Sequence, residues 1–203
     1  SLWSVFNDKA QEDTIRFDAI HDIAFNGYLF SQPDIAFYYA QSAYDFAKNK
    51  NLNHRITKAL NIQGVSFANR GDFTNAIKYF KQIITIRKNR GDKKQIPIAL
   101  NNVAGMYSLQ DDFKNAIDAE TEAIHISESN GNKNETAEYL INLGNFYMAN
   151  GDMKKSLTSL KRALKILIKL DDVRNTGLCY TNIANVYNHM GKLDKSLEYN
   201  LLA

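Results

Sequence analysis

The residue types that most often carry out catalysis are few and scattered in this chain. It has four histidines and a single cysteine, Cys179. The histidines lack the mutual spacing of metal ligands, and the apolar neighbours of Cys179 favour a buried, inert thiol. The sequence contains no glycine-rich phosphate loop, HExxH motif or Gly-x-Ser-x-Gly motif. We therefore predict no catalytic or metal site and no cofactor. The histidines are His21, His54, His125 and His189.

A short pattern built around a turn returns every forty residues along the chain. It occupies residues 71–76, 111–116, 151–156 and 191–196, and residues 31–36 are a more degenerate copy. A fixed step of roughly 20 to 50 residues is typical of solenoids, in which each unit buries its apolar face against its neighbours. The sequence thus predicts one repeat array.

Within a unit, apolar residues recur at helical spacing on both sides of the turn. Leu140 and Leu143 precede the turn, and Leu160 and Leu167 follow it. In the turn, a glycine can adopt the left-handed conformation that ends one helix, and an aspartate can cap the next. Each unit is therefore predicted to be a pair of antiparallel helices.

Small residues return at one position in each predicted helix. Because a small side chain lets two helices approach closely, these positions predict where the helices of a pair cross. In the first helix they are Ala24, Gly64, Ala104, Gly144 and Ala184, and in the second they are Ala36, Ala76, Ala116, Ser156 and Ser196.

Together with the tyrosines Tyr107, Tyr147 and Tyr187, and with Phe80 or Leu160 after the second small position, this pattern resembles the tetratricopeptide repeat. The resemblance covers residues 13–203. The usual repeat has about 34 residues, and the longer units here are similar to those of kinesin light chain, Pins-type adaptors and bacterial signalling proteins. The resemblance implies an all-α fold, a right-handed α-solenoid of about five antiparallel helix pairs.

The repeat pattern predicts how the chain is divided. Residues 1–12 precede the array and carry Trp3, so we expect them to form an N-terminal cap that packs on the first unit. The tetratricopeptide array then occupies residues 13–203. Its predicted units are residues 13–50, 51–90, 91–130, 131–170 and 171–203, and the last of them is incomplete.

The resemblance also implies where a ligand would bind, because the first helices of tetratricopeptide units line the concave wall of the solenoid. Asparagines recur on these helices in this chain. Their amides can bond to the backbone of an extended peptide, or to one another and so fix the stacking of the helices; both alternatives stay open. The candidates are Asn61, Asn101, Asn102, Asn142, Asn145, Asn182, Asn185 and Asn188.

At the N-terminal end, the same mapping predicts an acidic and aromatic pocket that could hold a cationic side chain. It would include His21, Asp22 and Tyr28, with Asp18 and Phe25, although His21 and Asp22 could equally pair locally. The family's lysine and arginine clamp for acidic C-termini is matched only by Lys58. The later clamp positions hold Ile98, Glu138, Asn142, Leu178 and Asn182, which disfavours binding of chaperone tails.

The charge and hydropathy of the chain limit its partners. The 25 basic and 22 acidic residues are interspersed, which argues against nucleic acid. No apolar run reaches the roughly 18 residues of a membrane span, so we expect no membrane contact.

The first 34 residues are similar to repeat regions of bacterial proteins that carry a cyclase or histidine kinase output. That resemblance implies a periplasmic or other extracytoplasmic location, with the cytoplasm as the alternative.

The favoured function is a non-enzymatic scaffold that binds a protein or peptide segment, as the sensory or interaction region of a larger bacterial signalling protein. One alternative is a regulatory phosphatase of the Rap type, although only twelve residues precede the array here. Another alternative is an oligomerisation module that self-associates through an apolar C-terminal end with Leu193, Leu197 and Leu201.

Overall fold

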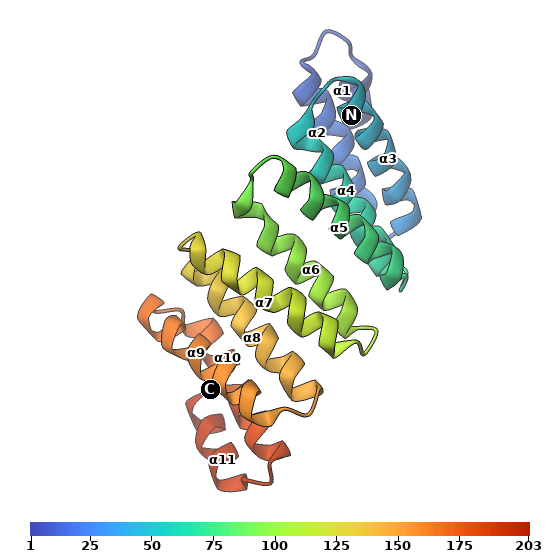
Figure 1. Cartoon of the computed structure of the whole chain (residues 1–203). Helices are drawn as coiled ribbons and strands as arrows, with labels where there is room; N and C mark the ends of the chain where they lie inside the picture. The colour runs from blue at the N-terminus through green and yellow to red at the C-terminus, as the bar shows by residue number, and fades with distance from the viewer. The chain divides into compact units, whose positions relative to one another are not determined.

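The computed structural model describes residues 1–203, and all of its regular secondary structure is helical. The prediction of an all-α array of antiparallel helix pairs is confirmed. The chain forms two compact units, Ser1–Gly91 and Asp92–Ala203 (Figure 1). The five ranges predicted from the repeat remain a prediction, because compactness divides the chain only after Gly91. No helix is both long enough and apolar enough to span a bilayer.

Unit 1 contains five α-helices and one π-helical segment. Its two apolar clusters centre on Phe17 and Ile20, and on Leu29 and Ile62. The elements are α1 (Leu2–Asn7), α2 (Asp13–Asp22), η1 (Ile23–Tyr28), α3 (Pro33–Asn49), α4 (Asn53–Asn69) and α5 (Phe73–Asn89).

The short helix α1 lies against α2, and its aromatic residues reach α3. The Phe6 ring meets Phe46 edge-on at 5.4 Å, and the Trp3 ring lies 5.9 Å from that of Tyr39. Arg16 of α2 donates a hydrogen bond to the Phe6 carbonyl. Residues 1–12 are thus held to the first helices by ring contacts and by one side-chain hydrogen bond to the backbone.

Unit 2 contains six α-helices and a 3₁₀ turn. Consecutive helices pack against each other, and Figure 1 shows α6 to α9 running in alternating directions. Buried side chains such as Leu140, Leu160 and Ile183 form its core. The elements are η2 (Lys93–Gln95), α6 (Ile96–Ser108), α7 (Phe113–Ser129), α8 (Lys133–Ala149), α9 (Met153–Leu170), α10 (Val173–His189) and α11 (Leu193–Leu202).

The turns between helices have the conformation that the sequence predicts. Gly71, Gly131 and Gly151 have φ of 77°, 72° and 85°, in the left-handed region that ends a helix without strain only at glycine. Asp111 and Asp171 adopt the same conformation, with φ of 57° and 55°, where other copies of the turn have glycine. Aspartate tolerates this region better than most residues do.

At five of the turns, the residue after the left-handed position caps the next helix with its side chain. Asp112 accepts a hydrogen bond from the backbone N–H of Asn115, and Asp152 does so from Lys155. Hydrogen bonds from Asn115 lower the pKa of Asp112 below its usual value. The predicted capping role is confirmed. Asp72, Asn132 and Asp172 cap α5, α8 and α10 in the same way.

The small residues lie where the helices of a pair meet. A Cβ atom on Gly64 would lie 2.8 Å from a ring carbon of Phe80, and one on Gly144 would lie 2.6 Å from Cγ of Leu160. Real Cβ atoms do not approach other carbons so closely, so α4 and α5, and likewise α8 and α9, are packed too tightly there for a larger residue. The predicted close approach is confirmed at both glycines.

Candidate functional site

The candidate asparagines of unit 2 lie on α6, α8 and α10, the first helices of successive pairs. Neighbouring helices among these three are in contact, through a hydrogen bond between α6 and α8 and through packing of α8 on α10. On α10 the residues Asn182, Asn185 and Asn188 follow each other at steps of three, which places them along one side of the helix.

The eight asparagines differ in whether their amides already have partners. Asn102, Asn145 and Asn182 are half-buried and Asn185 and Asn188 are exposed, and none of the five side chains hydrogen-bonds to another protein group. The Asn61 side chain, half-buried on α4 in unit 1, also has no such bond. These amides keep their donors and acceptors available to solvent or a ligand.

Asn101 and Asn142 instead belong to a hydrogen-bonded cluster inside unit 2. Nδ2 of Asn142 donates to Oδ1 of Asn101 at 2.9 Å, and Asn142 also hydrogen-bonds to Glu120 of α7. The same Asn101 amide atom that faces Asn142 also lies 3.0 and 3.2 Å from the two carboxylate oxygens of Glu120. The Glu120 side chain is fully buried. For these two asparagines the structure therefore shows bonds that link neighbouring helices.

The protonation state of Glu120 decides the orientation of the Asn101 amide. If Glu120 were ionised, the amide would have to turn and present its nitrogen to the carboxylate, and that nitrogen would also face Nδ2 of Asn142, which cannot accept. A protonated Glu120 removes this conflict, because the Asn101 oxygen then accepts from both neighbours. Burial raises the pKa of Glu120 to about 8, and the hydrogen bond with Asn142 opposes this shift. We therefore assign the neutral acid at neutral pH.

Glu120 was not predicted from the sequence, although the repeat contains a signal for it. It lies four residues after Ala116, the position at which Phe80 and Leu160 fill the core of their own helix pairs. A carboxyl group at a buried apolar position needs polar partners. The predicted asparagines Asn101 and Asn142 are those partners.

The residues predicted to form a pocket at the N-terminal end largely contact one another. His21 stacks on Phe17 and Phe25, with ring centroids 5.9 and 6.0 Å apart, and its Nδ1 lies 3.4 Å from Asp22. Burial lowers the pKa of His21, and the hydrogen bond with Asp22 opposes that shift. The imidazole is therefore mainly neutral at neutral pH.

Two of the groups expected to be free in that region are already engaged. Tyr28 stacks on Tyr39 at 5.6 Å, and Asp18 forms a salt bridge with Arg55. Asp22 and the partly exposed Phe25 remain as contact groups. The available surface around His21 thus offers one carboxylate and one phenyl ring.

The single thiol lies on α10 and faces α9 of the preceding helix pair. Cys179 is fully buried, its Sγ lies 3.1 Å from the Leu160 carbonyl, and burial raises the pKa of the thiol to about 12. A thiol that remains protonated at neutral pH is a poor nucleophile. No group of three or more His, Cys, Asp or Glu side chains is placed to bind a metal.

The stacked helix pairs define a helical-repeat protein. The sequence profile of the tetratricopeptide repeat matches residues 59–94 and again residues 135–202, together just over half of the chain. The chain belongs to the tetratricopeptide repeat family. This fold supports a protein-interaction scaffold.

Solved structures share the fold at low sequence identity. BtubC (BKLC) from P. vanneervenii is 16% identical, with a TM-score of 0.80 over 97% of this chain and 81% of its own. Kinesin light chain-type repeats from Podosopora anserina are 13% identical, with a TM-score of 0.77 and 93% of each chain covered.

A Rap protein in complex with a competence and sporulation factor is also similar in fold. It is 13% identical, with a TM-score of 0.71 over 93% of this chain and 63% of its own. No curated protein sequence matches this chain. At these identities the structural similarities establish the fold alone.

Proposed function

We propose that unit 2 binds an extended segment of a partner protein along the side formed by α6, α8 and α10. The observation that supports this proposal is the row of amides without protein partners at Asn102, Asn145, Asn182, Asn185 and Asn188. Each amide offers both a donor and an acceptor to a peptide backbone. The tetratricopeptide fold and a Rap relative crystallised with a competence and sporulation factor are consistent with this function.

The buried cluster has a supporting role in this proposal. Asn101 and Asn142 bond to each other, and together with Glu120 they join α6, α7 and α8. This cluster fixes the spacing of the helices that carry the free amides. Asn61, His21, Asp22 and Tyr28 lie in unit 1, so they would contact a different part of the partner. The similarity of the first 34 residues to bacterial signalling proteins supports a sensory or interaction role in such a protein.

Peptide display followed by affinity measurement tests the amide row. Peptides selected on the wild-type chain from a random library would be titrated into a variant with alanine at Asn102, Asn145, Asn182 and Asn185. At about 0.5 kcal/mol for each hydrogen bond, the variant should bind at least about thirtyfold more weakly. The control replaces Asn134 and Asn200 by alanine. These two asparagines lie elsewhere in unit 2, are exposed, and have side chains without a hydrogen-bond partner in the protein. Equal affinity of the row variant and the control would refute the proposal.

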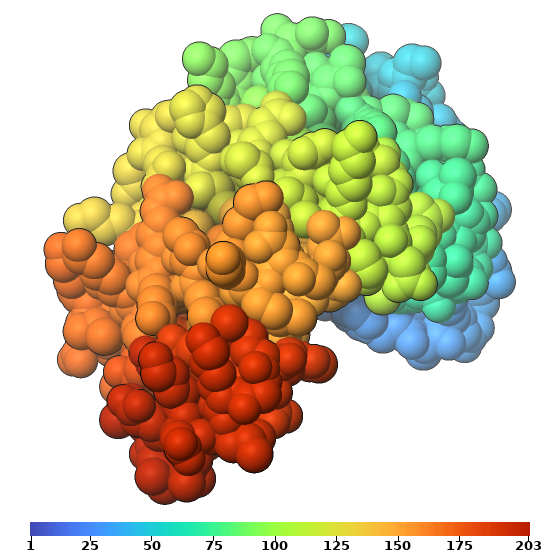
Figure 2. Space-filling model, turned by 60° about the horizontal axis from the view of Figure 1, so that its bottom comes forward, coloured from blue at the N-terminus to red at the C-terminus, as the bar shows by residue number.

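A second function, self-association, is favoured by the exposed face of α11. Leu193, Leu197 and Leu201 are 66%, 61% and 79% exposed and follow each other at steps of four, along one side of the helix. Figure 2 shows α11, in red, protruding beside the orange helices of unit 2, with its surface uncovered in that view. Sedimentation of the Leu197→Glu, Leu201→Glu double variant tests this function. A dimer that persists in the variant would exclude α11 as the interface.

A further inference from the structure

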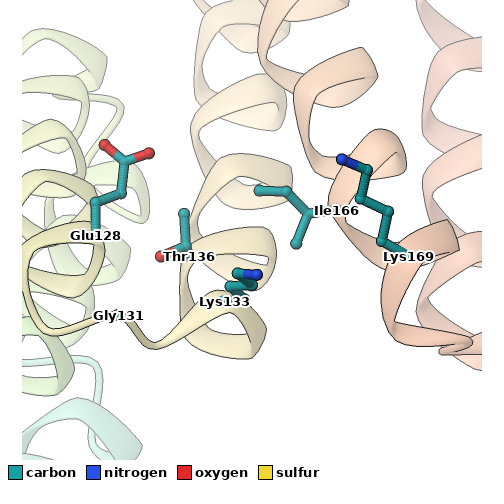
Figure 3. Close-up of a pocket in the computed structure, with 6 residues that line it drawn as sticks. All are labelled: Glu128, Gly131, Lys133, Thr136, Ile166 and Lys169. Carbon is teal, nitrogen blue, oxygen red and sulfur yellow. The ribbon is translucent and has the colours of Figure 1, made fainter.

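A separate pocket opens at the edge of unit 2, where the α7–α8 turn faces the end of α9. It has a volume of about 330 Å³ and is lined by Glu128, Gly131, Lys133, Thr136, Ile166 and Lys169. Figure 3 shows Thr136 and Ile166 between Glu128 on one side and Lys169 on the other. None of the candidate asparagines lines the pocket.

The charges around this pocket leave an excess of positive groups. The one acid in the lining, Glu128, forms a salt bridge with Arg162 of α9, so its charge is compensated. Lys133 and Lys169 are exposed and have no ion-pair partner. Lys165 lies one turn before Lys169 and is also unpaired, and α9 itself contains no acidic residue. A ligand in the pocket would therefore meet a positive rim.

The inner wall of the pocket is apolar. Ile166 is half-buried, and the Thr136 hydroxyl is already engaged, as a donor to the Asn132 carbonyl at 2.8 Å and with the Ser127 hydroxyl at 3.0 Å. Thr136 therefore offers a ligand its methyl group rather than a free hydroxyl. Ligand pockets of about 300 Å³ are at the small end of the usual range. The size suits one aliphatic side chain with its flanking backbone.

We propose that this pocket binds an acidic segment of a partner protein, with one aliphatic side chain against Ile166 and Thr136 and flanking carboxylates at Lys133 and Lys169. The apolar wall supplies the anchor and the unpaired lysines supply charge complementarity. This edge site is distinct from the side that carries the free amides, because none of those asparagines lines it.

Nuclear magnetic resonance of the whole ¹⁵N-labelled chain tests this proposal. The probe is the synthetic peptide acetyl-Glu-Asp-Leu-Asp-Glu-amide, and its partner replaces the leucine with alanine. We expect shifts centred on the amides of Gly131, Lys133 and Lys169, and an affinity at least about tenfold higher for the leucine peptide, because only leucine fills the apolar wall. Equal affinity of the two peptides would overturn the proposal and leave a diffuse basic surface.

Matched charge variants separate the pocket from general attraction. Lys133→Glu combined with Lys169→Glu should lower the affinity for the leucine peptide at least about tenfold. Lys48→Glu combined with Lys114→Glu makes the same change in net charge at exposed, unpaired lysines elsewhere and should bind within about twofold of wild type. Equal weakening in both variants would contradict the assignment. So would an anionic oligonucleotide that shifts the same amides at the same concentration, since it has no aliphatic anchor.

Discussion

The amide of Asn101 lies 3.0 Å from the carboxylate of Glu120, inside a helix pair whose equivalents elsewhere in the chain are filled by Phe80 and Leu160. The array therefore contains a buried polar contact at a position that is apolar in the helix pairs before and after it. Asn142, from the next helix pair, completes this contact. The asparagines repeated along the chain thus fall into two groups, one that joins helices and one whose amides have no protein partner.

The buried carboxyl group makes the stability of unit 2 depend on pH. The folded-state pKa of Glu120, about 8, lies above the value of about 4.3 for an unfolded glutamate. The protonated group therefore contributes stability that is fully present below the unfolded pKa and is lost as the pH rises through about 8. Glu120→Gln keeps a neutral donor at every pH. We therefore compare the free energy of unfolding of this variant with that of wild type at each pH. As the pH rises from about 4 to above about 8, we expect this difference to shift in favour of the variant by on the order of 2 to 4 kcal/mol.

Urea denaturation across this pH range measures the difference. The capping aspartates and His21 titrate in both proteins, so comparing the two curves isolates Glu120. Asp118→Asn removes an exposed carboxylate from the same helix and should follow the wild-type curve. Parallel curves for Glu120→Gln and wild type would show that Glu120 is ionised in the folded protein.

Truncation to alanine should change the stability of the chain by different amounts in the two groups of asparagines. Asn142→Ala removes the donor to Asn101 and Glu120, and leaving buried polar groups with fewer partners costs about 1 to 3 kcal/mol. Asn182→Ala, at the equivalent position on α10, removes an amide without a protein partner and should stay within about 0.5 kcal/mol of wild type. Thermal unfolding of the two single variants at neutral pH compares them directly, and equal melting temperatures would contradict the division into two groups.

The sequence predicted the helix pairs, the left-handed glycines and the capping aspartates because each depends on neighbouring residues that the repeat places in the same order every time. The outcome at Asn142 and Asn182 depends on a different helix. Both occupy the same position of the repeat, and only the presence of Glu120 on α7 gives one of them a buried partner. A repeat pattern compares equivalent positions, so it does not reveal a contact that occurs in one pair only.

The edge pocket was likewise outside the reach of the repeat pattern. Its lining combines Gly131 and Lys133 at the α7–α8 turn with Ile166 and Lys169 near the end of α9, more than thirty residues further along the chain. Whether Lys169 is unpaired depends on where Glu128 and Arg162 meet, which spacing within one unit does not determine.

Substitution by alanine should have opposite effects on stability at two helical glycines, because Gly144 lies at the close approach of α8 and α9 and Gly105 of α6 lies in open space. A Cβ at Gly144 would lie 2.6 and 2.8 Å from Cγ and Cδ2 of Leu160, so Gly144→Ala should destabilise the chain by roughly 1 to 3 kcal/mol through overpacking. Gly105 lies within α6 and a Cβ there meets nothing within 4 Å, so Gly105→Ala should stabilise by about 0.5 to 1 kcal/mol through helix propensity. Chemical denaturation of both variants tests the pair, and stabilisation by Gly144→Ala would show that Leu160 moves aside freely.

The hydroxyl of Ser156, which faces the same crossing, predicts a stabilising substitution. Its Oγ is buried and has no hydrogen-bond partner, while the equivalent residues Ala36, Ala76 and Ala116 carry no polar group there. Ser156→Ala removes an unsatisfied group and improves helix propensity, so we expect a gain of about 1 kcal/mol in the free energy of unfolding. Ser127→Ala is the matched control, because the Ser127 hydroxyl lies within hydrogen-bond distance of the Thr136 hydroxyl, at 3.0 Å, and of the Asn132 carbonyl, at 3.1 Å, and its loss should cost about 1 kcal/mol. If Ser156→Ala destabilised the chain as much as Ser127→Ala does, a bound water would have to satisfy the Ser156 hydroxyl, and the crossing would be less tightly packed than the contact between Gly144 and Leu160 indicates.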